Sequence, residues 1–226
     1  MNDKKLKRRA LPDYTRGEEL FNMISHIVGG GIGVLVLIAC ILVGAFRQNP
    51  LGVVLGILFG VSMIMLYTVS SIYHGLCTVG SKKVFQILDH CTIYFLIAGT
   101  YTPILLCKLA DKYPVNAWVT FGVVWGLAIL ATVLTAVDLH KYRHFSMVCY
   151  IGIGWSVIFS IVKVYEVLGA VGFALLLGGG IAYTVGALIY NLGKKAKKVR
   201  YLHSVFHLFV VLGSVLQALC IILYVL

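Results

Sequence analysis

Residues 21–46 read FNMISHIVGGGIGVLVLIACILVGAF, and this run contains no lysine, arginine, aspartate or glutamate. About 20 predominantly apolar residues are enough for a helix to cross the hydrocarbon core of a bilayer. The run is therefore long enough to span a membrane as one α-helix. The rest of the chain has the same character, since 60% of its 226 residues are hydrophobic, 12% are charged and its mean hydropathy is +0.96. So few polar residues cannot coat a water-soluble globule.

Six further apolar stretches follow the first one, and only short polar segments separate them. All seven are continuously apolar and do not alternate, which excludes a transmembrane β-barrel. The sequence therefore predicts an all-α integral membrane protein, a single bundle of seven transmembrane helices. The predicted helices are Phe21–Phe46, Leu51–Leu76, Val84–Leu106, Val115–Val137, Phe145–Val164, Leu168–Leu192 and Tyr201–Leu226.

The basic residues predict the orientation of this bundle. Fifteen of the 19 lysines and arginines lie before the first predicted helix or in loops on that same side of the membrane. By the positive-inside rule, the N-terminus is cytoplasmic and the C-terminus extracytoplasmic. We expect residues 1–18 to form a basic cytoplasmic segment and residues 19–226 the membrane domain. Attraction to anionic lipid accounts for the net charge of +11 without a nucleic-acid partner.

Three other features bear on processing and packing. The first apolar run is too long for a signal peptide, so we expect the first helix to be retained. The six cysteines include no C-x-x-C pair, and no disulfide framework is implied. Small residues let membrane helices approach closely. We expect this packing role for Gly52, Gly56 and Gly60, and for Gly122 and Gly126.

A short set of polar residues lies inside or at the ends of the apolar stretches. Burying such groups in a membrane is costly, so they mark functional sites by default. Helices 1, 3 and 7 begin on the amino-terminal side of the membrane and helix 2 ends there. We therefore expect all of these residues near the cytoplasmic face: Glu19, Asn22, His26, Ser70, His74, Asp89, His90, His203 and His207.

Three of the histidines form a candidate metal site. His203 and His207 are four residues apart, so their side chains project from one side of helix 7, about 6 Å apart at Cβ. With His74 as a third ligand, the set matches catalytic zinc sites, which keep a fourth position open for water. Asp89 would then lie near that water, and Ser70 could hydrogen-bond the water or a substrate oxygen.

Each of these residues also has a structural interpretation. A single membrane histidine is often a hydrogen-bonded packing residue, and Glu19 in a first helical turn could complement the helix dipole. His90 points about 100° away from its neighbour Asp89 around the helix, which favours a packing role. A three-histidine site also accepts first-row metals other than zinc.

Several ordered motifs contain these residues. They are S-x-x-x-H at Ser70 and His74, DHCTIYFLIAGTYTP at residues 89–103, and H-x-x-x-H at His203 and His207. Three further segments belong to the same set: Glu19-x-x-Asn22-x-x-x-His26, Gly154-Trp155 and Gly179-Gly180-x-x-Tyr183-Thr184-x-Gly186. Together, these motifs and segments resemble the hemolysin III branch of the progestin and adipoQ receptor family, and the resemblance covers essentially the whole chain.

This resemblance implies a seven-helix fold with a cytoplasmic N-terminus and a Zn²⁺ ion held by His74, His203 and His207. It places Asp89 beside the zinc-bound water and identifies Ser70 as the motif serine. Glu19, Asn22 and His26 are candidate supporting residues. The related alkaline ceramidases share this constellation, which implies a ceramidase-like amidase. The short loops and the resemblance together imply a bacterial plasma membrane.

A zinc-dependent hydrolase is the leading hypothesis for this site. Zinc lowers the pKa of bound water toward about 7, and Asp89 would act as general base and then as general acid. A site in the inner leaflet favours a lipid-like amide or ester as substrate. The alternatives are a receptor-like regulator of membrane lipid state, with zinc as a structural clamp, and a pore-forming cytolysin. The cytolysin reading is disfavoured because no amphipathic, soluble-to-membrane segment is present. A transporter would place its polar residues at the bilayer midplane rather than near one face.

Overall fold

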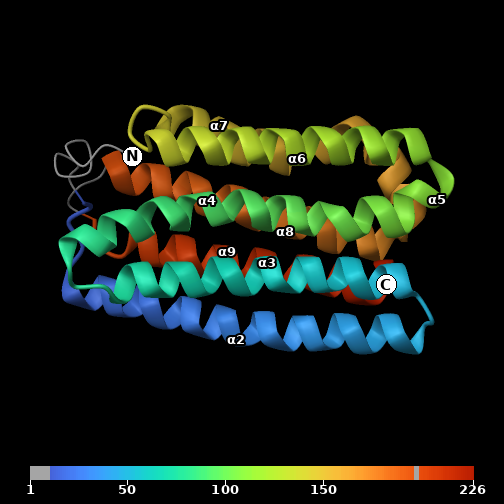
Figure 1. Ribbon diagram of the computed structural model, residues 1–226, viewed down its shortest axis with the longest axis horizontal. Coiled ribbons are helices and arrows are strands. Elements are labelled where there is room, and N and C mark those ends of the chain that lie inside the picture. Colours follow the sequence, from blue (N-terminus) through green and yellow to red (C-terminus); the bar gives the residue numbers. More distant parts are fainter. Residues whose placement is uncertain (1–10, 196–198) are drawn as a thin grey trace.

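The computed structural model describes residues 11–195 and 199–226, and every regular element in that part of the chain is helical. Within these described residues, six helices are long and apolar enough to cross a membrane. They run side by side in one bundle, and α2 begins at the end opposite to the chain's C-terminus (Figure 1). The elements are α2 (Arg16–Phe46), α3 (Pro50–Gly75), α4 (Val79–Ile104), the π-helical turn η1 (Leu105–Leu109), α5 (Ala110–Lys112), α6 (Pro114–Val137), α7 (Arg143–Gly154), the 3₁₀ segment η2 (Ser156–Ser160), α8 (Ile161–Lys195), α9 (Leu202–Cys220) and the π-helical turn η3 (Ile221–Val225).

A capping box fixes the start of α2. The Glu18 backbone N–H donates to the Thr15 hydroxyl at 3.2 Å, and the Thr15 backbone N–H donates to the Glu18 carboxylate at 2.8 Å. These two bonds satisfy backbone donors that a helix end leaves free. The helix therefore begins at Arg16, ahead of the predicted Phe21 and inside the segment predicted to precede the membrane domain. The structure does not describe the basic residues at positions 1–10 or the side chains of the lysine run at 194–198.

The fifth candidate span is interrupted in its first third. It covers Arg143–Leu192, 50 residues in all, and α7 ends at Gly154 before the 3₁₀ segment η2. The Tyr101 hydroxyl lies in this break, where it donates to the Gly154 carbonyl at 2.7 Å and accepts from the Val157 N–H at 3.0 Å. A side chain thus satisfies backbone groups that an unbroken helix would have paired, as a non-aqueous environment requires.

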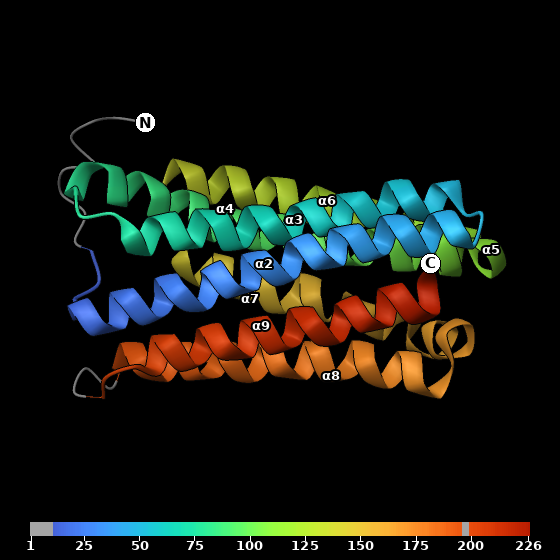
Figure 2. The same ribbon diagram turned by 90° about the horizontal axis from the view of Figure 1, so that it is seen from below.

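A second interruption in the same span reverses the chain. Gly169 has a φ of 68° and a ψ of 175° inside α8, a conformation that favours glycine. Figure 2 shows α8 returning beside α9 after this turn. The earlier interruption, η2, lies inside the predicted helix Phe145–Val164, so that segment is not one continuous α-helix.

The outer surface of the bundle is apolar. Phe46, Phe159 and Val162 are 84%, 88% and 75% exposed, and many other large apolar side chains also face outward. Exposed apolar area on this scale would be unstable in water and is typical of a surface covered by lipid. With its six long apolar helices, the chain is a multi-pass membrane protein.

Glycines allow α2 and α3 to pack closely. A Cβ atom on Gly29 would lie 2.6 Å from the Tyr67 ring, and one on Gly60 would lie 2.8 Å from the Leu37 Cα. The predicted packing role is thus found at Gly60 and at Gly56, where an added Cβ would lie 2.8 Å from the Cys40 Cβ, whereas one on Gly52 would meet Asn49 at the start of its own helix. It is not found at Gly122 and Gly126, where an added Cβ would meet no atom within 4 Å.

Candidate metal centre

Three histidines converge at one end of the bundle. His74 lies in the last turn of α3, and His203 and His207 lie in the first two turns of α9. One ligand nitrogen from each lies within 4.8 Å of the others, and Nε2 of His203 is 3.0 Å from Nε2 of His207. Nitrogens that each bind one zinc ion at about 2.1 Å lie at most about 4 Å apart. Only a small closure of the three side chains would therefore give the spacing that a zinc ion requires.

A carboxylate orients the first of these histidines. Nδ1 of His74 lies 2.6 Å from Oε2 of Glu19, and the Lys82 ammonium lies 2.8 Å from Oε1 of the same carboxylate. The contact fixes the imidazole ring and leaves its other nitrogen, Nε2, for a ligand. That Nε2 is buried and has no hydrogen-bond partner among the described residues. A carboxylate behind a metal-binding histidine is a common second layer of metal sites.

Residues of α2 support the second histidine of the pair on α9. His207 is 1% exposed, its Nδ1 lies 3.5 Å from the Ser25 hydroxyl, and its ring stacks on that of His26 at 3.7 Å. The Ser204 hydroxyl donates to the Asn22 side-chain oxygen at 2.7 Å, which joins α2 to α9. The candidate supporting residues Glu19, Asn22 and His26 thus all lie beside the histidine cluster.

The segment before α2 covers the cluster. The Tyr14 ring stacks on His203 with a centroid distance of 5.0 Å and an interplanar angle of 14°. Burial raises the pKa of the Tyr14 phenol well above its usual range, so the ring remains neutral. Tyr14 belongs to the predicted cytoplasmic segment 1–18 and Lys82 follows the second predicted helix, so neither was predicted at the site. The T-x-x-E pattern of Thr15 and Glu18 could have placed the helix start next to Tyr14.

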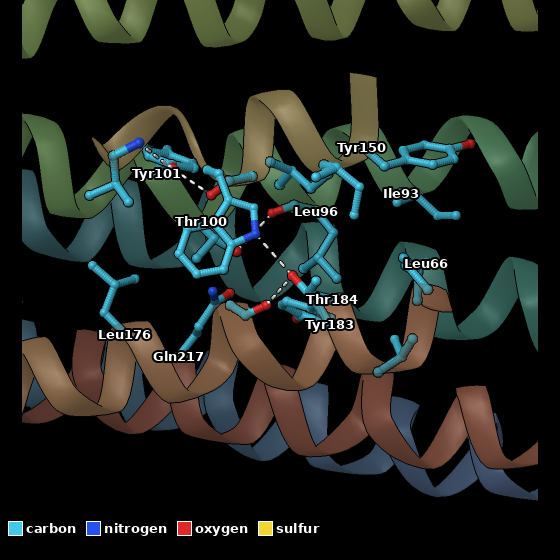
Figure 3. Close-up of a pocket in the computed structure, with 18 of the residues that line it drawn as sticks. Leu66, Ile93, Leu96, Thr100, Tyr101, Tyr150, Leu176, Tyr183, Thr184 and Gln217 are labelled. Atoms are coloured by element: carbon cyan, nitrogen blue, oxygen red, sulfur yellow. Dashed lines mark hydrogen bonds between the residues drawn. The ribbon is translucent and has the colours of Figure 1, made fainter. Parts of the chain in front are cut away.

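Asp89 and Ser70 face a cavity that also contacts His203 and His207. This cavity has a volume of about 180 Å³, and its walls are mostly apolar (Figure 3). The Asp89 carboxylate does not belong to the group of converging ligand atoms. His90 also borders the cavity, and its Nδ1 contacts the Gln86 carbonyl at 2.8 Å within its own helix.

The fold and the site together define a class: a multi-pass helical membrane protein with a buried three-histidine cluster at one end of an apolar cavity. The family model described as "Haemolysin-III related" matches residues 14–218. The chain therefore belongs to the haemolysin-III-related family, and the resemblance predicted from its motifs is confirmed.

The similar proteins include two from bacilli. "Hemolysin-3" of Bacillus cereus is 38% identical over 209 residues, which cover 92% of each chain. "Hemolysin-3 homolog" of Bacillus subtilis is 34% identical over 211 residues, covering 93% of this chain and 96% of that protein. The human "Monocyte to macrophage differentiation factor" is 26% identical over 161 residues, covering 68% of this chain and 63% of its own length.

Proposed function

We propose that this protein is a zinc-dependent hydrolase of lipid amides or esters that crosses a bacterial plasma membrane seven times. The observation behind this proposal is the convergence of His74, His203 and His207, with ligand nitrogens within 4.8 Å, beside an apolar cavity bordered by Asp89 and Ser70. Catalytic zinc sites typically use three protein ligands.

The seven-span topology is supported by the course of the chain. The turn at Gly169 would divide the stretch Arg143–Leu192 into two passes, and the start of α2 and the end of the chain lie at opposite ends of the bundle, as an odd number of passes would give. The excess of basic residues on the side where α2 begins favours a cytoplasmic N-terminus. The histidine cluster would then lie near the cytoplasmic face.

The chemistry of the donors supports a zinc ion. Neutral imidazole is a common zinc ligand, and the unpartnered Nε2 of His74 is a buried lone pair that a cation would satisfy. The contact from Glu19 would strengthen this ligand, since a carboxylate on the opposite ring nitrogen raises its basicity.

The residues around the cluster would divide the work of hydrolysis. A zinc ion in such a site activates water and polarises a carbonyl group. The Asp89 carboxylate would take up the proton and return it to the leaving group. The Ser70 hydroxyl would hydrogen-bond the substrate oxygen, and the apolar cavity walls would hold the acyl chain and exclude bulk water.

Fatty-acid release from an N-acyl lipid in reconstituted vesicles tests this proposal. We expect release by the wild-type protein and a reduction of about 100-fold or more in Asp89→Asn, because general acid–base catalysis contributes about 10²–10⁴ in rate. The matched control is Asp138→Asn, which changes the same type of side chain in the turn before α7, where it accepts from the Lys141 N–H.

Three results would contradict the hydrolase. Metal-loaded wild-type protein that releases no acid from amide or ester lipids would exclude it. If the same protein alters membrane fluidity without turnover, the receptor-like regulator becomes the better account. Ion flux through the vesicles without hydrolysis would instead indicate a pore or a transporter.

A further inference from the structure

The cavity extends well beyond the histidine cluster. Its walls run from His207 along α9 to Gln217, with Leu96 of α4 and Leu176 of α8 among the apolar residues on the way. An apolar channel of this shape suits an extended hydrocarbon chain. Any polar group that faces it therefore needs an explanation, because burying such a group without a hydrogen bond is costly.

Three sets of polar groups in the far part of the cavity are paired within the protein. The Trp155 indole N–H donates to the Thr184 hydroxyl at 2.9 Å, and that hydroxyl donates to the Gly180 carbonyl at 2.8 Å. Tyr101 pairs with the backbone at the break after α7. The Tyr183 hydroxyl shares a hydrogen bond with Ser214 at 2.7 Å. None of these groups needs a ligand.

Gln217 differs from these groups. The residue is 9% exposed, and in the described part of the chain no hydrogen bond reaches its carboxamide, which faces the cavity in Figure 3. Gly179 leaves room for the Gln217 side chain, because an added Cβ on Gly179 would lie 2.5 Å from the Gln217 Cγ. The carboxamide is open to the cavity, so an apolar ligand chain lying against it would remove water from an amide and leave that amide without a hydrogen-bond partner, which is costly. A ligand that presents a polar group here would avoid that cost.

The distance between Gln217 and the histidine cluster determines where along the ligand this polar group must lie. His207 and Gln217 are ten residues apart on one helix, which corresponds to about 15 Å at about 1.5 Å per residue. An extended chain covers this distance in about twelve bonds, at about 3.6 Å per three bonds. The carboxamide donates and accepts, and a hydroxyl group can do both in return.

We infer that the cavity binds an acyl chain hydroxylated near its twelfth carbon, with the hydroxyl group on Gln217 and the carboxyl end at the histidine cluster. This inference rests on the proposed function in one respect, since it describes the acyl chain of the proposed substrate. The subsite at Gln217 itself requires neither a metal nor turnover.

Equilibrium binding to the full-length, detergent-purified protein tests the subsite. The two probes are octadecanoate and octadecanoate hydroxylated at its twelfth carbon. We expect the hydroxylated chain to bind about tenfold more tightly to the wild-type protein, which is the effect of one added hydrogen bond. Gln217→Met, which keeps the length of the side chain and removes its hydrogen bonds, should bind both chains equally. Leu176→Met, on the apolar wall of the same cavity, should retain the preference.

Equal affinity of the wild-type protein for the two chains would overturn the inference without any variant. A preference that persists in folded Gln217→Met would overturn it as well. Failure of the hydrolase is a separate result, because a protein without metal or turnover that still prefers the hydroxylated chain would keep the subsite. Hydrolysis that is indifferent to chain hydroxylation, with equal binding of both probes, would remove the subsite alone.

Discussion

Glu19 connects the candidate metal centre to two other elements of the bundle. It comes from the first turns of α2, contacts His74 at the end of α3, and pairs with Lys82 in the first turn of α4. Its neighbour Glu18 has a different task, since it caps α2 and accepts from the Tyr201 backbone N–H at 2.8 Å. Of these two adjacent carboxylates, Glu19 therefore acts at the site and Glu18 caps the helix.

We expect Glu19→Gln to weaken zinc binding by about 10–100-fold, which is the usual effect of removing a partner behind a metal ligand. The substitution keeps the shape of the side chain and removes the charge that holds the His74 imidazole. Competition with a chelator of known affinity measures the change.

Glu18→Gln is the matched control for that measurement. It should keep the capping box, because glutamine can replace glutamate at this position of the motif, and leave zinc affinity unchanged. Equal losses of zinc affinity in both variants would show that Glu19 acts on the fold and not on the ligand.

At this scale the sequence predicts the histidines well and their surroundings poorly. Helical spacing places His203 and His207 together, and the parity of the helices brings His74 to the same end. Lys82 and Tyr14 were not predicted at the site, because each reaches it from a segment outside the apolar stretches. Their contacts depend on how the ends of the helices meet, which no periodic pattern encodes.

At the scale of the helices, the contact of α2 with α3 depends on glycine. We expect Gly60→Ala to destabilise the protein by about 1–3 kcal/mol, because its new methyl group would lie 2.8 Å from the Leu37 Cα and the backbones must separate. Thermal unfolding in detergent, followed by loss of the monodisperse species, measures the effect.

Gly31→Ala is the matched control, since a Cβ at that position meets no atom within 4 Å. The protein should be unchanged or slightly more stable, because alanine favours a helix more than glycine does. If the two variants unfold at the same temperature, close approach at Gly60 does not contribute to stability.

Helix positions follow from the sequence wherever apolar runs have clear ends. The predicted Val115–Val137 and Leu51–Leu76 each differ from α6 and α3 by a residue at one or both ends. The start of α2 is earlier than predicted because a capping box extends the helix through charged residues. The 3₁₀ break after Gly154 was not predicted, since the Tyr101 hydroxyl that stabilises it comes from a distant segment.

At the scale of the whole molecule, one cysteine can report the orientation in the membrane. Cys77 is exposed in the connection between α3 and α4, whereas the other five cysteines are buried. We expect a membrane-impermeant maleimide to label it in inside-out vesicles and not in intact cells, because that connection lies on the proposed cytoplasmic side.

The reversed control is Arg47→Cys in a Cys77→Ser background. Arg47 follows α2 at the other end of the bundle, so its replacement should react in intact cells. Labelling of Cys77 from outside intact cells would contradict the proposed orientation and would move the histidine cluster to the external face.

Zinc stoichiometry of the purified protein tests the central claim most directly. Elemental analysis without chelators should find about one zinc per chain in the wild type. The ion should be lost in the double variant His203→Ala/His207→Ala and largely retained in Asp89→Ala, because Asp89 is not among the converging ligands. A well-folded wild-type protein without bound metal, even after incubation with zinc, would contradict the account and leave the histidines as packing residues.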